Sequence, residues 1–198
     1  MKRQSIASLL VMLAIGLALT TNAFAQGDNT YYFTTYFSNA NTKGAPDSTV
    51  RIINDGSYTG SPYGNLWAAI YVFDDSQELQ ECCACGITPD GLLSESINKN
   101  LTANPLTGVT LTRGVIKIVG TTGNSATTLF PTPGLRVWAT HVQASSNEPE
   151  KGPFLVSETL AAPSNLSAGE QTQLQNLCAY DGMLSGVPCS CTPEGQNF

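Results

Sequence analysis

Six cysteines stand in two clusters, and their spacing admits three kinds of chemistry. The first cluster lies in the stretch ECCACG and the second in LCAYDGMLSGVPCSC. Their positions are Cys82, Cys83 and Cys85, followed by Cys178, Cys189 and Cys191. Thiolates bind zinc or iron–sulfur clusters, a Cys-x-x-Cys pair performs redox chemistry, and oxidised cysteines form disulfides. The compartment of the protein and the spacing of the clusters decide among the three.

The first 25 residues have the features of a bacterial secretory signal peptide. Lys2 and Arg3 form a charged start, residues 6–19 are apolar, and Ala23-Phe24-Ala25 is a small-x-small cleavage site before Gln26. The apolar stretch is shorter than the roughly 20 residues that a bilayer span needs, and we predict no membrane span in the mature chain. We therefore expect a secreted protein, periplasmic or extracellular, in a compartment where cysteines oxidise.

Pairing between the two cysteine clusters is favoured by strand geometry. Adjacent Cys82 and Cys83 point to opposite faces of a strand, so a bond between them would be strained. Zinc sites usually carry two Cys-x-x-Cys pairs, whereas the second cluster ends in Cys-x-Cys. Redox Cys-x-x-Cys pairs usually stand at the start of a helix, whereas the pair Cys82 and Cys85, which has this spacing, follows a predicted strand. We expect three disulfides between the clusters, in one of six connectivities, with no bound metal and no cofactor.

Other candidates for catalysis or metal binding are weak. His141, the single histidine, alternates in phase with Leu135, Val137 and Ala139, which indicates a strand residue near the core. A Ser-His-Asp arrangement is recognised only by geometry and stays open, but neither Gly-x-Ser-x-Gly nor His-Glu-x-x-His occurs. The stretch DDSQE, residues 74–78, resembles half of a calcium loop but has no EF-hand glycine or distal glutamate. It favours a solvated acidic turn.

One loop offers aromatic side chains for ligand binding. The stretch GSYTGSPYGN places Tyr58 and Tyr63 among small residues, and Trp67 follows shortly after it. Exposed aromatic rings in such a loop can stack on sugars or contact a partner protein. The alternative is that the rings fold back over one end of the domain. These three residues are the candidate ligand-binding site.

Charge and length limit the classes of function. Cleavage removes two basic residues, so the mature chain of 173 residues has seven basic and fifteen acidic residues and a net charge of −8. This charge disfavours nucleic acid as a partner. The length suits a single domain over residues 26–198 with its own core, including a helix and Cys-rich tail over residues 167–198.

Short β-branched and aromatic stretches recur between turn signals, and each is too short for a helix. The first predicted strands cover residues 31–37, 49–54 and 66–73, and another strand runs from residue 79 into the first cysteine cluster. The stretch LWAAIYVF is apolar on both faces, which is typical of a central strand covered on each side. Further strands are predicted at residues 114–120, 134–142 and 154–160.

A single helix is well signalled, near the C-terminus. Ser167 precedes AGEQTQLQNLCAY, and Glu170 stands three positions later as the partner in a capping box. Leu174, Leu177 and Cys178 would form its apolar face. Many short strands without intervening helices predict an all-β fold, an antiparallel β-sandwich or partly closed barrel with one C-terminal helix, stapled by disulfides.

The sequence favours a non-enzymatic function. We expect an exported structural or adhesive β-domain of the cell surface, extracellular matrix or a filament, with other copies of itself or a surface polysaccharide or protein as partners. The first alternative is a carbohydrate-binding module that uses Tyr58, Tyr63 and Trp67. The second is a secreted hydrolase built around His141 and carboxylates that the sequence does not identify.

Overall fold

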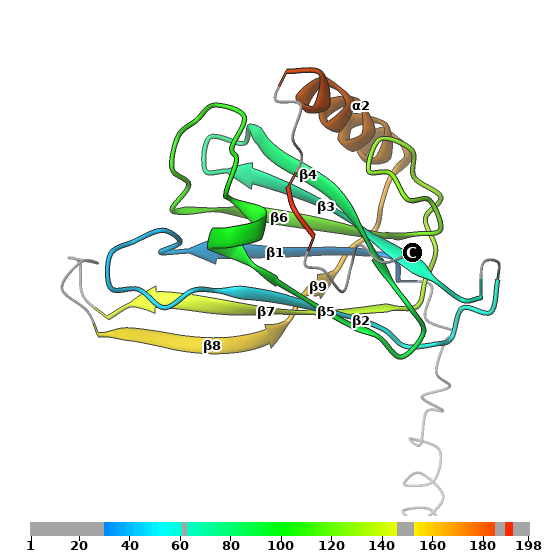
Figure 1. Cartoon of the computed structure of the whole chain (residues 1–198), viewed down its shortest axis with the longest axis horizontal. Helices are drawn as coiled ribbons and strands as arrows, with labels where there is room; N and C mark the ends of the chain where they lie inside the picture. Colours follow the sequence, from blue (N-terminus) through cyan, green and yellow to red (C-terminus); the bar gives the residue numbers. More distant parts are fainter. Residues whose placement is uncertain (1–29, 61–62, 146–152, 185–188, 192–198) are drawn as a thin grey trace, which may run out of the picture.

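The computed structural model describes residues 30–60, 63–145, 153–184 and 189–191 (Figure 1). The predicted signal peptide lies outside these residues. Among the described residues, no helix combines the length and the apolar character that a membrane span requires.

The described residues form two antiparallel sheets, a one-turn π-helix and one α-helix. The elements are β1 (Tyr32–Ser38), β2 (Thr49–Asn54), β3 (Leu66–Asp74), β4 (Leu79–Ile87), β5 (Leu92–Ser96), η1 (Ile97–Leu101), β6 (Arg113–Thr121), β7 (Leu135–Ala144), β8 (Phe154–Leu160), β9 (Ala162–Pro163) and α2 (Ala168–Leu184). Sheet A has the order β4-β3-β6-β1-β9, and sheet B has the order β5-β2-β7-β8.

The main core fills the space between the two sheets. Strand alternation sends every second side chain inward, so Val50 and Ile52 of β2 meet Ile70 and Val72 of β3 in one buried cluster. Strand β3 is also buried on its other face, where Tyr71 and Phe73 belong to a second cluster. Helix α2 covers that outer face of sheet A, as Figure 1 shows.

Helix α2 begins where its capping sequence predicts. The Ser167 hydroxyl accepts a hydrogen bond from the Glu170 amide at 3.1 Å, as an N-cap does. The Glu170 carboxylate then accepts bonds from the hydroxyl of Tyr32 at 3.0 Å and from the Lys117 amine at 2.6 Å. Leu174 and Cys178 are buried against sheet A. The helix is thus fixed to the sheet by polar contacts at its start and by apolar packing farther along.

The predicted antiparallel sandwich with a C-terminal helix is confirmed. In the described part of the chain the two sheets do not close into a barrel, so the barrel alternative is wrong. Strand β3 is central and buried on both faces, as its apolar sequence indicates. Three short elements were not predicted: β5, η1 and β9. Strand β5 was missed because Glu95, a charged residue type, occupies one of its inward positions and is fully buried.

Candidate functional site

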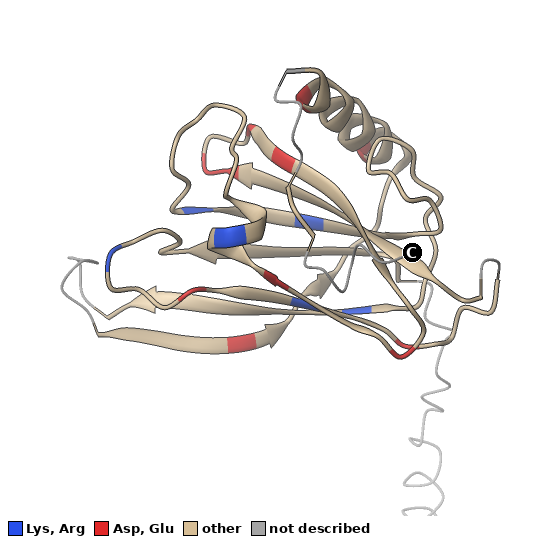
Figure 2. Ribbon diagram, viewed as in Figure 1, with Lys and Arg blue, Asp and Glu red and all other residues tan. Residues whose placement is uncertain are grey.

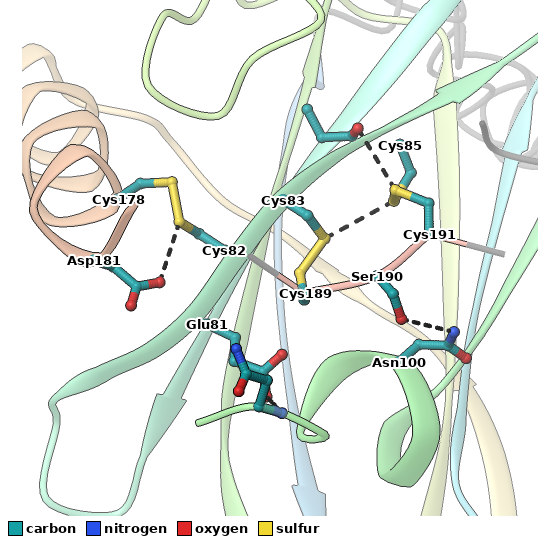
Figure 3. The surroundings of a disulfide bond; sticks show 12 residues. Glu81, Cys82, Cys83, Cys85, Asn100, Cys178, Asp181, Cys189, Ser190 and Cys191 are labelled. Atoms are coloured by element: carbon teal, nitrogen blue, oxygen red, sulfur yellow. Dashed lines mark hydrogen bonds between the residues drawn. A yellow bond between two sulfur atoms is a disulfide. The ribbon is translucent and has the colours of Figure 1, made fainter. Parts of the chain in front are cut away.

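Three disulfides join the first cysteine cluster to the second (Figure 3). The bonds are Cys82–Cys178, Cys83–Cys189 and Cys85–Cys191. Each cysteine of β4 is therefore bonded to the helix or the tail, with sequence separations of 96, 106 and 106 residues. The expected pairing between clusters is confirmed, and the connectivity follows the order of the cysteines along the chain.

The three bonds lie on both faces of β4. Cys82 belongs to the outer cluster beneath α2, whereas Cys83 and Cys85 belong to the core between the sheets. This division follows from strand alternation, and it sends one bond to the helix and two to the tail. The sulfur atoms of Cys83, Cys85 and Cys191 lie within 4.8 Å of one another. Each is bonded covalently to another sulfur, so none is a thiolate that could bind zinc.

Hydrogen bonds add to the cover over β4. The Ser190 amide donates to the Asn100 carbonyl at 3.2 Å, and the Asn100 side chain donates to the Ser190 hydroxyl at 3.3 Å (Figure 3). Near the start of β4, the Gln80 side-chain carbonyl accepts from the hydroxyl of Thr107 at 2.8 Å. The tail and the loop after η1 therefore cover this edge of sheet A. We call β4 with these covering segments the closed edge.

Two buried carboxylates lie at the closed edge beside the Cys82–Cys178 bond. Glu81 and Asp181 are 1% and 2% exposed, and an Asp181 oxygen lies 3.7 Å from the sulfur of Cys82. Burial raises the pKa of Glu81 to about 7, against the effect of a hydrogen bond from the Asn104 amide, and the charge of Asp181 raises it further. Sequence reasoning missed this pair, because residues 81 and 181 are a hundred positions apart.

The three candidate aromatic residues do not form one platform. Tyr58 packs against the core between the sheets, and its ring lies over Gly60. Trp67 alternates on β3 with inward-facing Leu66 and Ala68, so it points to the outer face of sheet A. Tyr63 is 93% exposed and has a φ of 55°, in the left-handed region. Tyr58 and Trp67 therefore lie on opposite sides of sheet A.

His141 lies at the rim of the core, near the core as its alternation indicates. It is buried, one ring nitrogen lies 2.8 Å from the Thr159 hydroxyl, and its ring stacks on Tyr36 with centroids 4.2 Å apart. Burial lowers the pKa of His141, and the Tyr36 backbone opposes this shift. These contacts tie β7 to β8 and β1, which is a structural role.

The carboxylate of Asp74 closes the acidic turn after β3 by accepting hydrogen bonds. The Asp74 side chain accepts hydrogen bonds from the amides of Ser76 and Glu78, each at 2.9 Å, and from the Gln80 side chain at 2.8 Å. The neighbouring Asp75 pairs with Arg113 at 2.6 Å. The arrangement is that of a turn closed by an aspartate.

Strand β8 forms an open edge on the other side of the molecule. It pairs with β7 and is the last strand of sheet B, and in the part of the chain that the structure describes, Figure 1 shows no helix or strand beyond it. All its side chains except that of Phe154 are exposed, including the large apolar residues Leu155, Val156 and Leu160. We call β8 the open edge. The sequence predicted this strand with correct bounds but not its exposure, which depends on the neighbours that sheet B provides.

Comparisons with known proteins found no match, whether to family models, to curated proteins or to solved structures.

Proposed function

We propose that this protein is an exported, non-enzymatic structural or adhesive β-domain that acts at the cell surface, in extracellular matrix or in a filament. The open edge is the observation that supports this proposal most. A strand with free main-chain groups and exposed apolar side chains is a surface to which another chain adds by β-pairing. Such a surface serves assembly or attachment.

The closed edge supports the same proposal. Three disulfides suit an oxidising compartment and are uncommon in proteins of the cytosol. They tie the C-terminal helix and tail to β4, and such cross-links stabilise a fold by restricting the unfolded chain. Such covalent reinforcement is useful to a protein that persists in a surface layer or matrix.

Localisation and binding assays on producing cells test the proposal. Antibody labelling and fractionation should place the protein outside the cytoplasm, trimmed before Gln26 and retained in surface or matrix material. A cytoplasmic pool with free thiols would contradict the proposal. Turnover of polysaccharide or ester substrates by the purified protein would favour the hydrolase alternative. Strong selective binding on a glycan array, lost in a Tyr58→Ala and Tyr63→Ala variant, would favour the carbohydrate-binding alternative.

A further inference from the structure

The main chain of β8 presents alternate amides to the open edge. The Ala161 amide donates to the Val137 carbonyl at 2.8 Å, and the Ser145 amide donates to the Pro153 carbonyl at 3.1 Å. These two bonds lie at the two ends of the β7–β8 pair and share its register. Because hydrogen-bonded pairs alternate along an antiparallel ladder, the odd-numbered residues of β8 bond to β7. The amides of the even-numbered residues, 154 to 160, therefore point away from β7.

We propose that the open edge pairs with β8 of a second copy of this chain, antiparallel and about a two-fold axis at Ser157. This inference names the partner for the proposed function and rests on it. In this register Phe154 faces Leu160 of the second copy, and Val156 faces Glu158. In this register each even-numbered residue of one β8 faces an even-numbered residue of the other β8. The outward amides and carbonyls of the two strands therefore meet. Four such pairs, each with two bonds, give about eight main-chain hydrogen bonds. Two four-stranded sheets become one of eight strands.

The single charge on β8 favours this register over the neighbouring one centred on Glu158. Glu158 is the one charged residue of the strand (Figure 2), and it pairs within its own chain with Arg51. A two-fold axis at Ser157 places each Glu158 opposite an uncharged Val156. An axis at Glu158 would place two carboxylates directly opposite each other, which is destabilising. The axis at Ser157 also pairs all seven residues of the strand, which neither neighbouring axis does.

The open edge has few of the features that prevent strands from pairing between molecules, since its one charged residue is Glu158, which is paired with Arg51 of the same chain. Natural edge strands carry charged side chains, most often lysine, or proline, an inward charge or a bulge. Strand β8, with the sequence FLVSETL, has no lysine or proline, and its pairing with β7 shows no register shift. Its side chains at 155, 156 and 160 are apolar and more than half exposed. Pairing between copies would cover these side chains without any change in the fold.

Cysteine cross-linking of the mature, disulfide-bonded chain tests the register directly. Ser157 would face its own copy in a non-hydrogen-bonded pair, with Cα atoms about 4.5 Å apart, within the range of a disulfide. A Ser157→Cys variant should therefore form a covalent dimer rapidly under mild oxidation. Leu155→Cys is the matched control, because it lies on the same face but its two copies would be about 14 Å apart. Peptide mapping should show the three native bonds intact in both.

A pair of charged substitutions at Val156 gives a second test, in which sedimentation equilibrium measures the dissociation constant of the dimer. Val156→Lys places an amine opposite Glu158 of the second copy, whereas Val156→Glu places a carboxylate there. The two variants should differ in dimer dissociation constant by roughly 2- to 30-fold, with the lysine variant tighter, since two equivalent cross-strand pairs change.

Equal cross-linking of Ser157→Cys and Leu155→Cys, or a monomer at every concentration, would overturn the proposal. Dimers in solution without surface localisation would reject the proposed function alone, whereas surface localisation of a monomer would reject this inference alone.

Discussion

The two edge strands β4 and β8 of this sandwich differ in whether other segments cover them. At the closed edge, β4 is bonded by three disulfides to the helix and the tail, and its residues other than Ala84 are buried. At the open edge, no other described strand pairs with the outer side of β8, and almost all of its side chains are exposed. Edge strands present unpaired amides and carbonyls of the kind that promote association; those of β4 are covered, whereas no described segment covers those of β8.

The difference separates stability from association. All six cysteines are used at one edge, where they close long loops and restrict the unfolded chain. None lies on β8, where a covalent cover would block strand pairing. The asymmetry is consistent with a domain whose closed edge maintains the fold and whose open edge is free to bind another chain.

Reduction of all three disulfides should have the largest effect on stability. The Cys82–Cys178 bond alone spans 96 residues, and the chain-entropy estimate for such a loop is about 4 to 5 kcal/mol. That is comparable to the whole stability of a small domain, about 5 to 15 kcal/mol. Thermal unfolding followed by circular dichroism should show a large drop in melting temperature on reduction. An unchanged melting temperature would mean that the closed edge does not depend on its bonds.

Single-bond variants should differ in a definite order. With Cys83–Cys189 intact, Cys82–Cys178 closes an additional loop of about 12 residues, and Cys85–Cys191 closes one of about 4. The estimates are about 3 and about 2 kcal/mol. Replacement of Cys82 and Cys178 by alanine should therefore destabilise the protein more than replacement of Cys85 and Cys191, as measured by urea unfolding. The reverse order would show that contacts of the tail, rather than loop closure, dominate the closed edge.

Glu81 should make the closed edge sensitive to pH. Its pKa in the folded protein is raised from its usual value of about 4.5 to about 7, so between these values the folded state holds a proton that the unfolded state has released. The contribution of Glu81 to the free energy of unfolding is therefore fully present at low pH. It is lost as pH rises from about 4.5 to about 7, by at most about 1.4 kcal/mol per pH unit.

The variant Glu81→Gln isolates this pH effect, since its amide oxygen can still accept the bond from Asn104. Relative to this variant, the unmodified protein should lose stability as pH rises through the window, as measured by urea unfolding at a series of pH values. The matched variant Asp181→Asn should shrink the window without removing it, because burial is the largest cause of the shift and Asp181 a smaller one. A constant difference between Glu81→Gln and the unmodified protein across the window would show that Glu81 does not titrate there.

The sequence predicts the strands at the two edges better than it predicts which segments cover those strands. Alternation and turn signals located β2 and β8 with correct bounds, and the adjacency of Cys82 and Cys83 predicted that their side chains point to opposite faces of a strand. The connectivity was not predictable, because six pairings satisfy the same spacing. The burial of Glu81 and the exposure of β8 were not predictable either, since both depend on segments far away in the sequence. Local patterns specify strands, whereas the packing of distant segments determines which edge is covered.

Alanine substitutions at the open edge should have the smallest effect on the stability of the monomer. Val156 is 55% exposed, whereas Val72 of β3, opposite Glu81 in the β3–β4 pair, is fully buried. The variant Val156→Ala should cost less than about 0.5 kcal/mol in the monomer, and Val72→Ala about 2 kcal/mol, because two buried methyl groups and their packing are lost. Urea unfolding at a protein concentration too low for association measures both. Equal losses would mean that β8 is covered in the isolated chain, and the contrast between the edges would then fail. A small loss for Val156→Ala combined with weaker self-association would show that this apolar side chain serves the contact between copies rather than the fold.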